Sequence, residues 1–371
     1  MKTVAHCATP FLTETGSWIH SQIRPLRRYR PIVLTQEARN QAEFPVPVLY
    51  TAEAYGWARA AANRLGRRLT GEYPFYGAIL RREGAALIHA HFGYQGCRCL
   101  RAQRQAGIPM VTTFYGADAG QFPRQRVWQE RYRRLFSQGA LFLAEGSALA
   151  AQLVRLGCPP DRVRVHHLGV DVGRIAYRAR EADGPVRVLM CGHFREKKGF
   201  PEGLRALGQA ATRTGVQCEV VLIGDGPQRR EVLDAAASSG LRDRVSLLGL
   251  QPYTRVIAEL GRCHLLLQPS RTAADGDTEG GAPVILLDAQ AAGVPVVGTT
   301  HADIPEYVVE GESGLLAPEG DEDGLAERLA YLLTHPGVWG PMGRRGRRHV
   351  EEHYSAERQC RSLEEIYDSL T

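Results

Sequence analysis

Lysine is almost absent from this chain of 371 residues, which contains only Lys2, Lys197 and Lys198. Arginine therefore supplies nearly all of the positive charge, and the two adjacent lysines stand out. No run of apolar residues reaches the roughly 20 positions that a membrane-spanning helix needs. Residues 1–16 also lack the apolar core of a signal peptide and instead indicate a first strand. These absences predict a cytoplasmic protein without a membrane-spanning segment.

The eight cysteines follow no zinc-binding spacing, and most stand in apolar, strand-like segments. Their one close pair is Cys97 and Cys99. Disulfides are rare in reducing compartments, so we expect these side chains to be free thiols.

Positive charge is concentrated in the first half of the chain. Residues 1–180 carry 26 Lys and Arg against 11 Asp and Glu, whereas residues 181–371 carry 20 against 29. The arginines of the first half form two groups: Arg24, Arg27, Arg28 and Arg30, then Arg124, Arg126, Arg131, Arg133 and Arg134. Trp128 and Tyr132 alternate with the second group. A basic face with aromatic anchors suits an anionic membrane surface, here the inner face of the cell membrane, or an acidic acceptor. No nucleic-acid recognition motif accompanies the charge, and merely solvated arginines remain the alternative.

Strand-like runs alternate with helical patterns in both halves of the chain. The predicted strands are 3–7, 31–35, 86–90, 110–113 and 141–144 in the first half, and 186–191, 219–223, 244–247, 265–267 and 294–297 in the second. This alternation predicts an α/β protein with one parallel sheet in each half. The polar segment 178–185 is the expected linker. Two doubly wound domains would bind ligands in a crevice at the carboxyl ends of their strands.

Residues 275–298 contain the most informative motif. Glu279 precedes the small-residue corner Gly280-Gly281-Ala282, where a ligand can approach the backbone. Pro283 fits the first position of a helix that ends near Gly293. Free amides at a helix N-terminus form an anion site suited to phosphate. Glu279 repels phosphate and is expected to accept hydrogen bonds from hydroxyls, so the pair of sites predicts a nucleotide sugar.

Three further loops each follow a predicted strand of the second half. Residues 191–199 offer Arg195, Lys197 and Lys198 between glycines, which fits a diphosphate. Gly224-Asp-Gly226 allows a tight turn near a nucleoside, and a third loop begins at Gly249. Each loop alone is weak evidence for a nucleotide-binding site. Their order is stronger evidence, because each loop follows a predicted strand of the same domain.

These motifs resemble the GT-B retaining glycosyltransferases of family 4, over essentially the whole chain. The segments that carry the resemblance are 192–199, 223–227, 249–250, 269–270 and 279–297, with 88–93, 113–118 and 168–171 in the first half. The sequences of residues 88–118 and 275–305 are similar to those of the branch of this family that builds bacterial exopolysaccharide and surface polysaccharide. The resemblance implies two Rossmann-like domains: 1–178 for the acceptor and 179–355 for the nucleotide sugar. Residues 356–371 would form a helix that packs back on the first domain.

The resemblance also assigns roles to residues. Lys198 and Arg195 would hold the diphosphate, Glu279 the donor sugar and Asp288 the ribose hydroxyls, while the backbone near Leu250 would meet the base. The other expected donor contacts are Gly16, Gly192, His193, Gly224, Gly226, Gly280, Gly281, Ala282, Pro283 and Val284. Expected acceptor or sugar contacts are His91, Tyr115 and Asp118. For Asp118, a structural role that holds its own loop is an equal alternative.

Some positions depart from the family pattern. His193 stands where a cation usually follows the glycine, and Arg195 is interpreted as its replacement. Asp288 replaces a glutamate and lies one residue further from Glu279 than is customary. Tyr115 replaces a histidine, so a sugar-contacting imidazole is absent or comes from His89 or His91. Histidines 89 and 91 form a possible metal pair without a third ligand, and a cleft-lining role is the preferred interpretation.

The predicted activity is transfer of a hexose-type sugar, with retention, from a nucleoside diphosphate sugar to a glycan or lipid-linked acceptor. UDP is preferred over GDP. No cofactor or metal is expected, because cations meet the leaving-group charge and Asp275-Gly-Asp277 resembles a metal-binding motif only superficially. The alternatives are a sugar phosphorylase, a sugar-nucleotide epimerase using Glu14 and Asp118, or a non-catalytic nucleotide-sugar-binding module.

Overall fold

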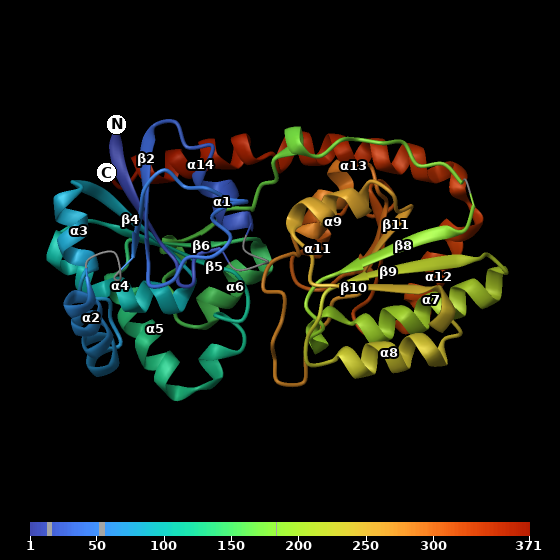
Figure 1. Cartoon of the computed structure of the whole chain (residues 1–371), viewed down its shortest axis with the longest axis horizontal. Coiled ribbons are helices and arrows are strands. Elements are labelled where there is room, and N and C mark those ends of the chain that lie inside the picture. Colours follow the sequence, from blue (N-terminus) through green and yellow to red (C-terminus); the bar gives the residue numbers. More distant parts are fainter. Residues whose placement is uncertain (13–16, 52–55, 183) are drawn as a thin grey trace. The chain divides into compact units, whose positions relative to one another are not determined.

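A computed structural model describes residues 1–12, 17–51, 56–182 and 184–371 (Figure 1). The chain divides into two compact units. Unit 1 comprises Met1–Gly169 together with Ala356–Thr371, and unit 2 comprises Val170–Ser355. Each unit contains one parallel sheet, which confirms the predicted α/β class.

The described part of unit 1 has a seven-stranded sheet in the order β3-β2-β1-β4-β5-β6-β7. Its strands are β1 (Lys2–Cys7), β2 (Tyr29–Thr35), β3 (Leu49–Thr51), β4 (Ala85–His91), β5 (Met110–Phe114), β6 (Leu141–Ala144) and β7 (Val163–Val165). Its helices are α1 (Ser17–Ile23), α2 (Trp57–Thr70), α3 (Tyr76–Arg82), α4 (Gly93–Ala106), α5 (Arg126–Gln138), α6 (Ser147–Arg155) and α14 (Ala356–Asp368). The five strands predicted for the first half are all present.

The last helix, α14, belongs to unit 1 and covers one face of its sheet. Its Leu363 and Tyr367 pack in a core with Val4 of β1 and Leu87 of β4. The carboxylate of Glu364 accepts hydrogen bonds from the backbone N–H groups of residues 27 and 28 at 2.7 and 2.6 Å. The chain termini consequently lie close together within this unit (Figure 1).

Unit 2 has a six-stranded sheet in the order β10-β9-β8-β11-β12-β13 within its described residues. Its strands are β8 (Val186–Cys191), β9 (Cys218–Ile223), β10 (Val245–Gly249), β11 (Leu265–Gln268), β12 (Val296–Thr299) and β13 (Gly314–Ala317). Its helices are α7 (Phe200–Thr214), α8 (Arg229–Ser238), α9 (Tyr253–Leu260), α10 (Ile285–Ala291), α11 (Ile304–Tyr307), α12 (Glu322–Thr334) and α13 (Trp339–His353). The five predicted strands are again present, the last shifted by two residues.

Apolar side chains fill both faces of the unit 2 sheet. In β9, Val220 and Leu222 enter one core, whereas Val221 and Ile223 enter the other. Such continuous apolar strands are typical of parallel sheets covered by helices on both sides. Strand order reverses between β8 and β11, and open α/β sheets bind ligands outside the carboxyl ends of the strands at such a reversal.

None of the helices in the described part of the chain combines the length and the apolar character needed to cross a bilayer.

Candidate active site

The glycine loops of unit 2 pack against one another at the carboxyl ends of β8, β9 and β10. The N–H of Gly192 donates to the carbonyl of Ile223, and that of Gly224 to the carbonyl of Gly249, both at 2.9 Å. A Cβ on Gly224 would lie 1.9 Å from the carbonyl oxygen of Gly192, so only glycine fits there. Leu250 follows Gly249 and is 49% exposed. The sequence-predicted loops are therefore brought together.

Lys198 and Glu279 form a largely buried ion pair at the same edge of the sheet. Lys198 Nζ donates to Glu279 Oε2 at 2.8 Å, and Ser270 Oγ donates to Glu279 Oε1 at 2.7 Å. Burial by itself would raise the Glu279 pKa, but the positive charges of Lys198 and Lys197 and these hydrogen bonds lower it below its usual value. Glu279 is therefore a carboxylate that accepts hydrogen bonds.

The neighbouring cations, Lys197 and Arg195, differ in how tightly hydrogen bonds and ion pairs hold their side chains. Lys197 Nζ donates to Asp277 Oδ1 at 3.1 Å and to the carbonyl of Thr278 at 2.9 Å, which ties the two loops together. Arg195 Nη1 is 3.9 Å from Asp277 Oδ2, and its side chain is 55% exposed. Arg195 is therefore exposed and only loosely paired, whereas Lys197 is held by two hydrogen bonds to the neighbouring loop. The acidic loop around Asp277 contributes to this structural contact.

The corner after Glu279 differs in one respect from the sequence prediction. Pro283 is not the first helical residue, because α10 begins at Ile285 with Val284 as its N-cap. The N–H of Leu286 bonds to the carbonyl of Pro283 at 3.0 Å, so a turn precedes the regular helix. Gly280 adopts φ 80°, a left-handed conformation that favours glycine.

Asp288 lies on α10 and is held by a tyrosine from α9. The hydroxyl of Tyr253 donates to Asp288 Oδ1 at 2.8 Å. Burial raises the pKa of Asp288 to about 7, although the Tyr253 hydrogen bond acts in the opposite direction. The second carboxylate of the site therefore titrates near neutral pH.

A histidine–glutamate pair that sequence analysis missed supports the same corner. The backbone N–H of Glu279 donates to His301 Nε2 at 3.2 Å, and His301 Nδ1 lies 2.7 Å from Glu319 Oε2. Because Nε2 accepts, Nδ1 carries the proton and donates to the carboxylate. From the sequence, Ser270 was identified only as part of the 269–270 motif. His301 follows β12 at the carboxyl edge, and that placement was the one available signal.

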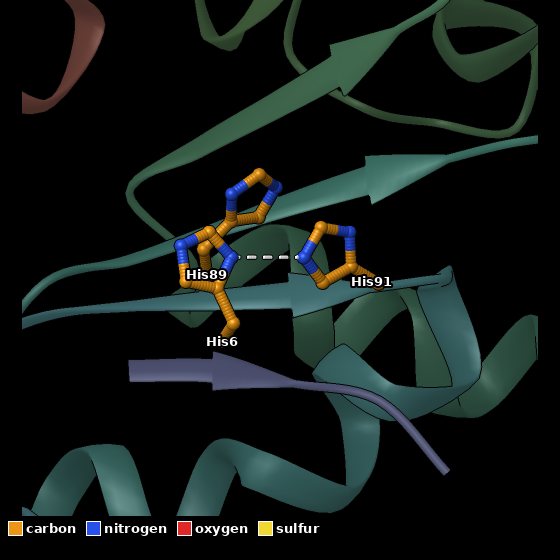
Figure 2. A group of neighbouring side chains, drawn as sticks. All are labelled: His6, His89 and His91. Carbon is orange, nitrogen blue, oxygen red and sulfur yellow. Dashed lines mark hydrogen bonds between the residues drawn. The ribbon is translucent and has the colours of Figure 1, made fainter. Parts of the chain in front are cut away.

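Three histidines of unit 1 gather on neighbouring strands (Figure 2). His6 from β1 joins His89 and His91 from β4, and one ring nitrogen from each lies within 4.8 Å of the others. His6 Nδ1 and His91 Nε2 are 3.0 Å apart. All three side chains are fully buried. The expected cleft-lining position of the pair is therefore wrong, and the expected absence of a third histidine is wrong too.

Hydrogen bonds occupy most of these ring nitrogens. His89 contacts Tyr367 and Thr113 hydroxyls at 2.6 and 2.7 Å, and His91 Nδ1 contacts the Tyr115 hydroxyl at 2.6 Å. His6 Nε2 has no hydrogen-bond partner among the described residues. Burial lowers all three histidine pKa values, that of His6 to about 3. The cluster is thus a neutral hydrogen-bonded network, and a metal ion would have to displace some of its bonds.

Asp118 holds the loop that follows β5. One carboxylate oxygen accepts from the N–H of Gly93 at 2.8 Å, and the other accepts from Tyr115 and Gly116 at 3.1 and 2.9 Å. Its side chain is buried. Of its two interpretations, this geometry matches the structural one. Gly16 and Glu14 lie outside the described residues.

The basic residues of unit 1 are only partly available to a partner. Arg28 pairs with Glu364 at 3.2 Å, and Arg30 pairs with Glu83 at 3.0 Å. Tyr132 is 1% exposed, so its proposed role as a surface anchor is wrong. Its ring fills the core because residue 132 faces inward on α5. All eight cysteines are free thiols.

Known proteins resemble both units. Residues 24–174 match the family described as Glycosyltransferase Family 4, and residues 185–335 match the one described as Glycosyl transferases group 1. The amylovoran biosynthesis glycosyltransferase AmsK of Erwinia amylovora is 34% identical over 292 residues, which cover 77% of this chain and 70% of AmsK. The putative colanic acid biosynthesis glycosyltransferase WcaL of Escherichia coli K12 is 33% identical over 291 residues, covering 77% and 71%.

Solved structures share the fold at lower identity. Anabaena HepE in complex with UDP-glucose superposes with a TM-score of 0.79 at 18% identity, over the full length of both chains. Sucrose-phosphate synthase from Thermosynechococcus elongatus gives 0.77 at 17% identity, over 100% of this chain and 99% of the other. The chain belongs to the family 4 (group 1) glycosyltransferases and has their GT-B fold.

Proposed function

We propose that the enzyme moves a hexose-type sugar, with retention, from a nucleoside diphosphate sugar to a glycan or lipid-linked acceptor in surface-polysaccharide synthesis. UDP is the first candidate for the nucleotide and GDP the second. The observation that carries this proposal is the buried Lys198–Glu279 pair beside the glycine loops. It sets a cation for phosphate next to a carboxylate for sugar hydroxyls.

The donor has complementary partners in this corner. The ammonium of Lys198 has three N–H groups, and Glu279 Oε2 takes one of them, which leaves donors for diphosphate oxygens. Arg195 adds a second, exposed cation. Gly192 has no side chain and is only partly buried, so a donor could approach its backbone closely, and Asp288 would accept from the ribose hydroxyls.

The reaction breaks the bond between the anomeric carbon and the diphosphate oxygen, whose electron pair leaves with the nucleoside diphosphate. The acceptor hydroxyl oxygen bonds to the anomeric carbon on the same face, and its proton passes to the departing phosphate. Lys198 and Arg195 would stabilise the negative charge that grows on the leaving group. Cations fixed in advance at such a position lower the barrier because they need little reorganisation.

Unit 1 would bind the acceptor. His91, Tyr115 and Asp118 would act from beneath its loops, since their hydrogen bonds fix the backbone around Gly116. An anionic membrane surface is the proposed partner of the basic residues. The similarity to AmsK, of amylovoran biosynthesis, and to WcaL, a putative enzyme of colanic acid biosynthesis, supports the polysaccharide assignment. The UDP-glucose complex of HepE supports UDP-glucose as the first donor to test.

A thermal-shift panel of UDP, GDP, ADP and their common sugar conjugates, with and without Mg²⁺, tests the donor. A ligand at a hundred times its Kd stabilises the folded protein by about 2.7 kcal/mol. We expect one base to stand out without metal, and the anomeric configuration of the transfer product to match that of the donor. Free phosphate as the preferred ligand would favour a phosphorylase, and donor binding without transfer to any acceptor would favour a binding module.

A further inference from the structure

Unit 1 contains an arginine-lined cavity between α2, α4 and α5. Its volume is about 560 Å³. Its charged lining is Arg67 and Arg68 of α2, Arg98 of α4 and Arg131 of α5, and Thr70 and Gly71 complete one wall. We call this cavity the arginine pocket. Four positive charges around one space create a strong local field that attracts an anion.

The charges of the arginine pocket are not neutralised within the described residues. None of its four arginines forms an ion pair there, in contrast to Arg28 and Arg30 of the same unit. Arg98 donates to the hydroxyl of Tyr73 at 2.9 Å, and the guanidinium of Arg131 lies 4.8 Å from the Trp128 ring centroid. These neutral partners orient the two guanidinium groups and leave their charge available.

One carboxylate, Glu72, adjoins the arginine pocket and shares a smaller cavity with Arg98 and Arg131. Its Oε1 lies 4.0 Å from Arg104, which is not part of the pocket lining. Arginine forms paired, planar hydrogen bonds with phosphate oxygens. The pocket therefore fits a phosphate or diphosphate group.

Helix α2 also exposes an apolar stripe next to the arginine pocket. Trp57, Ala61, Leu65 and Leu69 recur every four residues and so share one face of the helix. The exposed fractions are 86% for Trp57, 60% for Leu65 and 77% for Leu69. Leu69 itself lines the pocket. Apolar side chains beside arginines on an exposed helix are typical of helices that lie in a membrane interface.

We propose that the arginine pocket binds the phosphate-bearing headgroup of an anionic membrane lipid while the apolar stripe of α2 enters the interface. The stripe favours a lipid over a free phosphate compound or a nucleic acid, since neither of those covers exposed Trp57 and Leu65. This inference rests on the proposed membrane partner. It does not depend on the donor chemistry of unit 2.

Vesicle sedimentation tests the site. Wild-type protein should bind vesicles of phosphatidylcholine mixed equally with phosphatidylglycerol, and not vesicles of phosphatidylcholine alone. The double variant R67A/R68A should bind the anionic vesicles about thirtyfold more weakly, because each arginine near an anionic surface contributes roughly fivefold to the affinity. The matched control R101A/R164A removes two exposed arginines from α4 and β7, outside both the pocket and the two arginine groups of unit 1, and should retain most of the affinity.

A second pair of variants separates the possible sources of the phosphate group. W57S/L65S leaves the arginines in place and should also lose vesicle binding, whereas a pocket for free anions would leave W57S/L65S unaffected and would respond to inorganic pyrophosphate alone. Equal losses in R67A/R68A and R101A/R164A would overturn the proposal, as would binding of an RNA homopolymer in place of vesicles. UDP binding, measured in each variant, reports unit 2 separately, so loss of vesicle binding with intact UDP binding leaves the donor proposal standing.

Discussion

Lys198 and Glu279 form an ion pair in a buried corner of unit 2. The contact of 2.8 Å lowers the pKa of Glu279, and the carboxylate in turn lowers the energetic cost of burying the ammonium. Ser270 and the backbone contact with His301 fix the position of Glu279 on its other sides. A donor that enters this corner meets groups whose charge and direction are already set.

The substitution K198A is predicted to weaken UDP binding roughly ten- to hundredfold, since hydrogen bonds to charged groups contribute about 1.5–3 kcal/mol. Titration calorimetry measures the change. The matched control is K197A, which removes an adjacent lysine that bonds to Asp277 and Thr278. K197A should lower stability more than affinity, and unchanged UDP affinity in K198A would reject the diphosphate role.

Single residues were predictable from sequence where a motif surrounds them. Glu279, Lys198 and the loop glycines stand in loops whose order along the chain identifies them. His301 and His6 could not be found this way, because each acts through a partner distant in sequence. His301 is 18 residues from Glu319, and His6 is 85 residues from His91.

At the scale of elements, the contact between α9 and α10 positions the titrating carboxyl group of Asp288. Tyr253 begins α9 and reaches Asp288 in the buried first turn of α10. The folded pKa of Asp288 lies above its ordinary value of 3.8 because burial penalises the charged form. Its contribution to stability is therefore present below pH 3.8 and is lost as the pH rises through about 7.

The affinity for a UDP-sugar is predicted to rise as the pH increases through about 7, because the ionised Asp288 accepts hydrogen bonds from ribose hydroxyls better than the acid does. A UDP-sugar is the appropriate ligand, since its diphosphate has no proton to lose in this range. Affinity measured across this pH range checks the prediction, with D288N as the control. D288N should bind with little pH dependence, and a slope equal to that of the wild type would assign the titration to another group.

The predictability of an element depended on its length and pattern. Apolar runs such as 186–191 predicted strands correctly. The strands β3 and β7 were missed because each has three residues and lies at a sheet edge, where β7 reads Val-Arg-Val and is mostly exposed. Pro283 suggested a helix start two residues early, since proline suits the turn before α10 as well as its first position.

At the scale of the whole molecule, each unit carries its own sheet and its own buried polar groups. Unit 1 includes α14, whose Tyr367 bonds to the histidine network of β1 and β4. The pKa of His6 is lowered from 6.5 to about 3 by burial, so the folded unit holds it neutral while the unfolded chain takes up a proton below pH 6.5. The stabilising contribution of neutral His6 is therefore complete above pH 6.5 and is lost as the pH falls towards 3.

We therefore predict that the free energy of unfolding of unit 1 decreases as the pH falls below about 6.5. Each buried histidine whose pKa is lowered makes this pH dependence steeper. Tryptophan fluorescence of a W339F background measures this, because the remaining tryptophans, Trp18, Trp57 and Trp128, all belong to unit 1.

Two variants separate this effect from general acid denaturation. H6N places an amide near the position of Nδ1, keeps the contact with His91 and removes one titrating group, so it should flatten the pH dependence. H353N removes an exposed histidine on α13 and should leave it unchanged. A slope in H6N equal to that of the wild type would show that His6 does not contribute.

The substitution E279Q tests the central claim most directly, namely that one corner of unit 2 holds both the diphosphate and the sugar of the donor. The variant keeps an acceptor for Ser270, releases Lys198 from its ion pair and removes the charge that would accept sugar hydroxyls. Calorimetric titration of E279Q with UDP and with a UDP-sugar should show UDP binding as tightly as in the wild type or more tightly, and the UDP-sugar binding roughly tenfold more weakly. Equal losses for both ligands would contradict the assignment of Glu279 to the sugar.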